Sequence, residues 1–148
     1  MNSDFSDLLR LFNASNVRYL VIGDMPSFNT PNRVIPKDLD LWISTDAANA
    51  SAVFQALLEF GAPLQGMTEK DFAQEGYFYQ MGMPPVCVDI LMGIPGLQFD
   101  EAWERRNRVV FDQLPVNFIS KDDLITAKRA AGRPQDIIDA DLLSGTSR

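Results

Sequence analysis

The stretch Lys37-Asp-Leu-Asp-Leu-Trp-Ile43 decides the fold, because its charged and apolar residues alternate with the period of a β-strand. Side chains two positions apart on a strand leave the same face. The pattern therefore predicts that Asp38 and Asp40 point one way while Leu39 and Leu41 point into a core. Two close carboxylates repel each other unless a cation compensates them. A hard divalent ion such as Mg²⁺ is the natural partner of this pair.

Two further apolar stretches have the composition of strands. Val86-Cys-Val-Asp-Ile-Leu91 carries a third aspartate, Asp89, inside a β-branched run. Arg18-Tyr-Leu-Val-Ile-Gly23 stops at a glycine, which predicts a buried strand that ends in a tight turn. By contrast, Asp139-Ala-Asp141 lies in a predicted helix, where residues two apart face different sides. We therefore expect Asp38, Asp40 and Asp89, and not the helical pair, to converge on one site.

Composition predicts a single domain over residues 1–148, with 46% hydrophobic residues and a net charge of −7. This acidic balance argues against an extended surface for DNA or RNA, although a local basic pocket stays possible. The chain holds no histidine, which excludes histidine triads and histidine zinc sites. Any chemistry must therefore use carboxylates and cations.

The compartment predicted from the sequence is the cytoplasm. Cys87 is the only cysteine, so no internal disulfide can form. The start Met1-Asn-Ser-Asp-Phe-Ser-Asp7 is acidic where a signal peptide would be basic. Asp89 interrupts the best apolar run, so no segment approaches the roughly 20 residues of a membrane helix. We expect a soluble protein with no membrane partner.

Hydrophobic periodicity and caps predict an alternation of helices and strands of the α+β class. Caps are expected at Ser120 and Thr68, and stops at Gly61 and Gly132. Helices are predicted over about 4–14, 46–60, 99–106, 121–131 and 134–143, with short ones after Thr68 and near Pro26. Strands are predicted over about 18–23, 38–43, 77–81, 86–91, 109–111 and 116–119, the last two forming a hairpin around residues 112–115.

These residues resemble the nucleotidyltransferase superfamily that includes DNA polymerase beta and small bacterial minimal nucleotidyltransferases. Some of the small members are toxin or abortive-infection components, which would place the protein in a toxin-antitoxin system. The matching motifs are Tyr19-Leu-Val-Ile-Gly23, Lys37-Asp-Leu-Asp-Leu41 and Val88-Asp-Ile90. The closing segment 121–136 also looks like the carboxy-terminal part of stand-alone members. The resemblance spans about residues 17–141.

The resemblance implies a mixed β-sheet flanked by helices, with further helices at the carboxy-terminus. It implies that Asp38, Asp40 and Asp89 are the catalytic and metal-binding residues for Mg²⁺ or Mn²⁺, and that Gly23 begins a turn that cradles nucleotide phosphates. The implied reaction moves a nucleoside monophosphate from an NTP such as ATP to a hydroxyl acceptor on tRNA or other RNA, a protein or a small molecule.

Basic residues near the predicted site are candidates for neutralising phosphate charge. Lys37 flanks the aspartate pair, and Lys128, Arg129 and Arg133 lie near the end of a predicted helix. Lys128 is the leading candidate of this cluster. The alternative is a solvated surface in which these cations favour the helix dipole.

The turn after Gly23 departs from the family pattern. Asp24 stands where the family has a small residue, and its carboxylate would repel phosphates. Pro26 removes one N–H donor from the expected cradle. Asp24 could instead cap a helix. The rival hypotheses are a catalytically degenerate fold that acts as a partner-binding module, and a plain structural or metal-binding domain.

Cys87, Trp42 and Trp103 are interpreted as packing residues. A lone buried cysteine is usually a small hydrophobic residue. Neither tryptophan has interleaved aromatic and basic neighbours in sequence of the kind that stack nucleic-acid bases. We expect both tryptophans in the core or at its rim.

Overall fold

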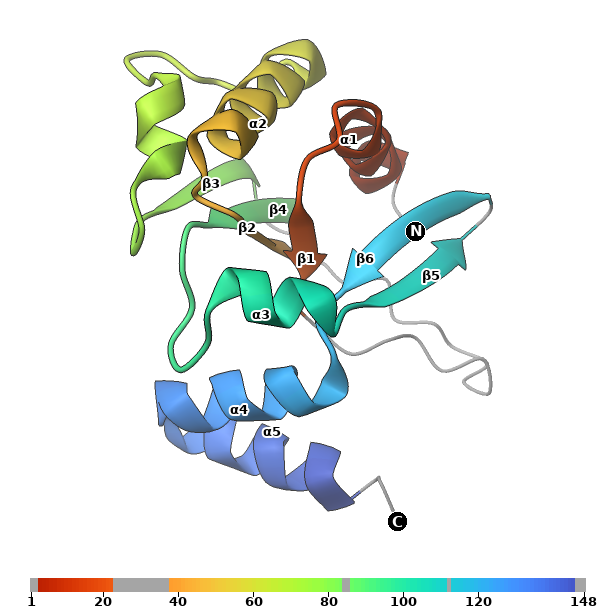
Figure 1. Ribbon diagram of the computed structural model, residues 1–148, viewed down its shortest axis with the longest axis vertical. Coiled ribbons are helices and arrows are strands. Elements are labelled where there is room, and N and C mark those ends of the chain that lie inside the picture. Colours follow the sequence, from red (N-terminus) through yellow and green to blue (C-terminus); the bar gives the residue numbers. More distant parts are fainter. Residues whose placement is uncertain (1–2, 23–37, 84–85, 112, 146–148) are drawn as a thin grey trace.

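The computed structural model describes residues 3–22, 38–83, 86–111 and 113–145, and these residues form a mixed sheet with helices on both sides (Figure 1). This arrangement confirms the predicted α+β class with helices at the carboxy-terminal end. Each helix in these ranges is too short or too polar to cross a membrane.

The six strands lie in the order β3-β4-β2-β1-β6-β5. The central pairs are mixed: β1 is antiparallel to β2 but parallel to β6, and β2 is parallel to β4. Antiparallel hairpins, β3–β4 and β5–β6, form the two sides. The strands are β1 (Tyr19–Val21), β2 (Asp38–Ile43), β3 (Phe78–Met83), β4 (Val86–Leu91), β5 (Asn107–Phe111) and β6 (Leu114–Phe118).

One face of the sheet is covered by helices α1 (Ser3–Ala14) and α2 (Ala47–Phe60) and the 3₁₀ helix η1 (Glu69–Ala73) (Figure 1). The apolar residues of β2, among them Leu39 and Leu41, join this core. The strand alternation predicted from the sequence is therefore confirmed on this side, because every second residue of β2 is buried here.

The other face carries helices α3 (Phe99–Glu104), α4 (Lys121–Ala131) and α5 (Pro134–Gly145) (Figure 1). Leu20 and Trp42, which are cross-strand partners, pack with residues of α3 and α4 in a second, smaller core. Trp42 meets Phe99 edge to face, with ring centroids 5.1 Å apart. This contact confirms Trp42 as a core residue.

Several helix ends follow the predicted local chemistry. The Ser120 hydroxyl accepts the N–H of Asp123 at the start of α4, and the Thr68 capping box opens η1. Gly61 and Gly132 end α2 and α4 with φ of 91° and 72°, the left-handed conformation that glycine adopts without strain.

The predicted hairpin was wrong in its extent. Phe111 pairs directly with Leu114, so the strands run closer to the turn than residues 109–111 and 116–119 suggested. Gln113 supplies a φ of 68°, which allows a tight connection without glycine. Pro115 was interpreted as a turn residue, but it lies within β6 and pairs with Val110.

Candidate carboxylate site

The register between β2 and β4 brings two of the three predicted aspartates side by side. Asp40 and Asp89 are direct partners on adjacent parallel strands, and Asp38 is the partner of Cys87. Directly paired residues leave the same face of a sheet, with strands about 4.8 Å apart. The predicted convergence of Asp40 and Asp89 is therefore confirmed. The side chain of Asp38 lies outside the described residues, although its backbone pairs two positions before Asp40.

The aspartate pair occupies the sheet face that carries α3, α4 and α5. Leu41 and Ile90, which follow the two aspartates, are buried on the opposite face. Gln80 is the partner of Asp89 on the outer strand β3 and is exposed. Asp40 and Asp89 are themselves half-buried. The result is a polar row across three neighbouring strands, open toward β3.

Asp89 Oδ1 is the unusual atom of this row. It is buried, and it has no hydrogen-bond partner among the described residues. A buried polar atom without a partner costs about 1–3 kcal/mol, and such atoms are few in native proteins. The strand next to Asp89 carries a second carboxylate, Asp40, as the direct partner of Asp89. A bound cation or a ligand donor would remove this cost.

The two carboxylates fit part of a divalent-metal site. Their oxygens are the hard donors that Mg²⁺ and Mn²⁺ prefer. Among the described side chains, no group of three or more histidine, cysteine, aspartate or glutamate residues could hold a metal ion. The predicted third ligand, Asp38, is not among these side chains, because its side chain lies outside the described residues.

Both ends of the segment 23–37 lie at the aspartate pair. Ile22, the last described residue before it, donates its N–H to the carbonyl of Asp40 at 2.9 Å. The predicted phosphate-site residues Gly23, Asp24 and Lys37 all belong to this segment and lie outside the described residues. Their roles stay predictions.

The cations predicted at the end of α4 have partners on α5. Lys128 Nζ lies 3.4 Å from Asp139, and Arg129 lies 3.6 Å from Asp141. Arg133, just before α5, lies 2.6 Å from Asp136. Asp139 and Asp141 thus bind different cations, which agrees with the prediction that they do not form one site. The structure gives Lys128 a role in joining α4 to α5, and its phosphate contact stays a prediction.

Ion pairs and burial shift several pKa values. The hydrogen bond from Arg133 lowers the pKa of Asp136 and, in return, Asp136 raises the pKa of Arg133. The hydrogen bonds from Arg105 to Asp123 raise the pKa of Arg105. Burial raises the pKa of Tyr79, whose hydroxyl donates to the carbonyl of Pro63 at 2.8 Å. These groups support the fold and lie apart from the aspartate pair.

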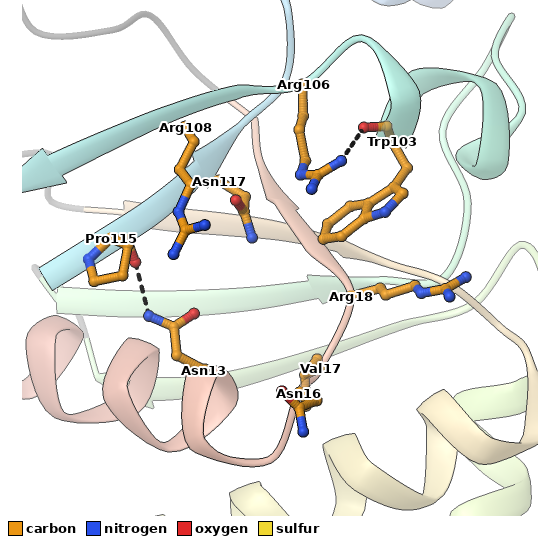
Figure 2. A pocket seen from close by; sticks show the side chains of 9 residues that line it. All are labelled: Asn13, Asn16, Val17, Arg18, Trp103, Arg106, Arg108, Pro115 and Asn117. Atoms are coloured by element: carbon orange, nitrogen blue, oxygen red, sulfur yellow. Dashed lines mark hydrogen bonds between the residues drawn. The ribbon is translucent and has the colours of Figure 1, made fainter.

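A cluster of arginines was missed in the sequence. Arg106 lies over the ring of Trp103, with its Cζ 3.9 Å from the ring centroid, beside a pocket of about 290 Å³ (Figure 2). The spacing of Trp103 and Arg106, three apart at a helix end, was the available signal. We call this cavity the arginine pocket; it is lined by Arg18, Arg106, Arg108, Asn13, Asn117 and Trp103, among others.

No protein-family model matches this chain, and a search of curated proteins finds no match either. The motifs and the geometry of the aspartate pair are therefore the features that point to a function.

Proposed function

We propose that the protein is a metal-dependent nucleotidyltransferase that moves a nucleoside monophosphate from an NTP to a hydroxyl acceptor. The observation that carries the proposal is the buried Oδ1 of Asp89, which has no hydrogen-bond partner among the described residues and lies directly across from Asp40 on a parallel strand. A structural carboxylate would have a donor from the chain, whereas a metal-binding carboxylate keeps an oxygen for the ion.

The place of the pair in the sheet supports the same reaction. Asp40 and Asp89 lie where β1 gives way to the segment that begins at Gly23. In the proposed site, N–H groups after Gly23 would hold the triphosphate, while Asp38, Asp40 and Asp89 would hold the metal. Bound Mg²⁺ or Mn²⁺ would neutralise the phosphate charge there.

The reaction assigns a separate task to Asp89. The acceptor oxygen attacks the α-phosphorus, and its proton passes to the Asp89 carboxylate. The bond from the α-phosphorus to the bridging oxygen breaks, and pyrophosphate leaves. A cytoplasmic location is part of the proposal, since the single Cys87 points to a reducing compartment.

Nucleotide binding tests the proposal directly. Wild-type protein is titrated with ATP and with GTP by calorimetry, in the presence of Mg²⁺, Mn²⁺ or EDTA. We expect binding that requires the metal and is lost in Asp40→Asn and in Asp89→Asn. Asp7→Asn is the matched control, because Asp7 is an exposed carboxylate on α1, and it should bind as wild type does.

The outcomes separate the rival hypotheses. Metal binding without any nucleotide response would contradict the enzyme and favour the partner-binding module. A response that survives in Asp40→Asn and Asp89→Asn would place the nucleotide elsewhere. The acceptor is then sought by incubating labelled NTP with tRNA, proteins and small hydroxyl compounds, and by following label transfer.

A further inference from the structure

The arginine pocket lies on the same sheet face as the aspartate pair but near the other side of the sheet. Arg108 on β5 is the cross-strand partner of Asn117 on β6. From β2 to β5 there are three strand spacings of about 4.8 Å, or about 14 Å across the sheet. Arg18, which precedes β1, accepts the N–H of Ser44 just past the end of β2, four residues beyond Asp40. The pocket is therefore separate from the aspartate pair at Arg18 as well as at Arg108.

The charges of the pocket are not compensated within the chain. Among the described arginines, those outside the pocket each form an ion pair with a carboxylate, and these are Arg10, Arg105, Arg129 and Arg133. Those of the pocket, Arg18, Arg106 and Arg108, form none in the described part of the chain, and no acidic residue lines the pocket. In a chain with a net charge of −7, carboxylates are plentiful. Their exclusion from this cavity leaves three cations for a ligand.

Arg106 is fixed in place before any ligand arrives. One terminal nitrogen, Nη1, donates to the carbonyl of Trp103 at 2.9 Å, and the guanidinium lies over the indole ring. Its Nε is buried and has no acceptor among the described residues. A buried N–H without an acceptor is costly, and an anion bound beside it would supply one. Figure 2 shows Arg106 and Arg108 reaching into the pocket on either side of Asn117.

The indole ring of Trp103 is not available to an aromatic ligand. Phe99 stacks with it at a centroid distance of 5.9 Å and an interplanar angle of 20°. Arg106 is in cation–π contact with the same ring. The pocket is therefore suited to the charge of a ligand and not to the stacking of a base.

Asn13 and Arg18, on another part of the pocket wall, are held by hydrogen bonds within the chain, and among the described residues no negative charge lies there. Asn13 donates its amide to the carbonyl of Pro115 at 2.7 Å, and its oxygen accepts the hydroxyl of Tyr19 at 3.0 Å. Burial raises the pKa of Tyr19 to about 12, so this hydroxyl adds no negative charge near neutral pH. The backbone of Arg18 is held by the buried side chain of Asn49, which bonds both its N–H and its carbonyl. The ligand would meet a preformed site.

We propose that the arginine pocket binds a phosphate group, free or as the monoester of a small molecule. Several guanidinium groups can share the oxygens of one phosphate, whereas a carboxylate is matched by a single guanidinium. The volume of about 290 Å³ is at the lower end for small-molecule sites, which excludes a large ligand. This inference is independent of the proposed nucleotidyl transfer, because it uses none of the aspartates.

The test is calorimetric titration in EDTA with inorganic phosphate and with ribose 5-phosphate, and with ribose as the uncharged control. We expect binding of a phosphate probe that weakens with added NaCl. Arg106→Gln and Arg108→Gln should each weaken it on the order of tenfold or more. Arg10→Gln, which removes an exposed charge on α1, should not. Arg108 is exposed, so its variant tests the site even if Arg106→Gln fails to fold.

The outcomes identify the phosphate ligand and show whether the pocket is separate from the carboxylate site. Tighter binding of ribose 5-phosphate identifies a monoester as the ligand, and equal or tighter binding of inorganic phosphate identifies the free anion. Binding by Asp89→Asn as by wild type separates this pocket from the carboxylate site. The proposal is overturned if neither phosphate probe binds, or if Arg10→Gln weakens binding as much as Arg108→Gln does.

Discussion

The carboxylates of the α3–α5 helices and those of β2 and β4 lie on the same sheet face, yet they differ in how the chain treats their charge. Asp123, buried at the start of α4, accepts three hydrogen bonds from Arg105 at 3.0–3.2 Å. Asp136 accepts two from Arg133. Asp89, by contrast, has a buried oxygen with no hydrogen-bond partner in the described part of the chain, and it lies across from Asp40.

We interpret this difference as one between structural carboxylates and carboxylates that bind a ligand. An arginine that binds both oxygens of a carboxylate fixes its position and leaves nothing for a ligand. Two paired aspartates on adjacent strands destabilise the sheet, because like charges directly opposite each other repel. Proteins retain such a cost at sites where a ligand removes it. The comparison therefore predicts opposite responses to the same aspartate-to-asparagine change.

The largest expected effect is on nucleotidyl transfer. Under the proposed function, Asp89→Asn removes the proton acceptor and a metal ligand together, so the rate of label transfer from NTP should fall at least about a hundredfold. The rate is measured with the acceptor that the label screen identifies. Asp7→Asn should keep the wild-type rate. An unchanged rate in Asp89→Asn would mean that other residues carry the reaction. The difference between Asp89 and Asp123 would then have no bearing on function.

The second effect is on the stability of the helical region. Asp123→Asn leaves Arg105 with a weaker acceptor and should lower the free energy of unfolding by about 1–3 kcal/mol. Urea denaturation followed by circular dichroism measures the change. Asp122→Asn is the control, because it removes an exposed charge from the same first turn of α4. If both variants lose equal stability, the helix dipole and not the Arg105 pair holds Asp123 in place.

Local rules applied to the sequence were enough to predict the strand positions of the aspartates and the ends of α4. Alternation in β2 and β4 placed the aspartates on one face, and their parallel pairing then brought Asp40 and Asp89 together. Caps at Ser120 and Gly132 bounded α4 because these signals depend on one or two neighbouring residues. Such features need no knowledge of tertiary packing.

The misses depend on pairing and packing that the local sequence does not specify, mostly between distant segments. Arg18, Arg106 and Arg108 form a pocket only after β1, β5 and β6 are assembled. The Arg105–Asp123 pair joins residues 18 positions apart, and no local rule links them. Pro115 was assigned to a turn from its usual preference, but strand pairing with Val110 overrides that preference.

The third effect is a gain in stability at the carboxylate site. In EDTA, Asp89→Asn relieves the repulsion with Asp40 and should raise the free energy of unfolding by about 0.2–1 kcal/mol. Adding Mg²⁺ or Mn²⁺ should stabilise the wild type but not the variant, which reverses their order. Thermal melts in EDTA measure the gain from relieved repulsion, and melts with added metal measure the stabilisation by the ion. A loss of stability in the metal-free variant would mean that Asp89 is a structural carboxylate like Asp123.

The smallest effect concerns acid unfolding of the helical region. Arg133 lowers the folded-state pKa of Asp136 below its ordinary value of 3.8. The stability from this pair is therefore fully present above pH 3.8 and is lost as pH falls through the lower folded value. Asp136→Asn should flatten the decline of stability in that acid range and leave the Asp89 region unaffected. Urea midpoints measured from neutral pH into this range test it. A decline of equal slope in the variant would show that the pair, although formed, contributes nothing in solution.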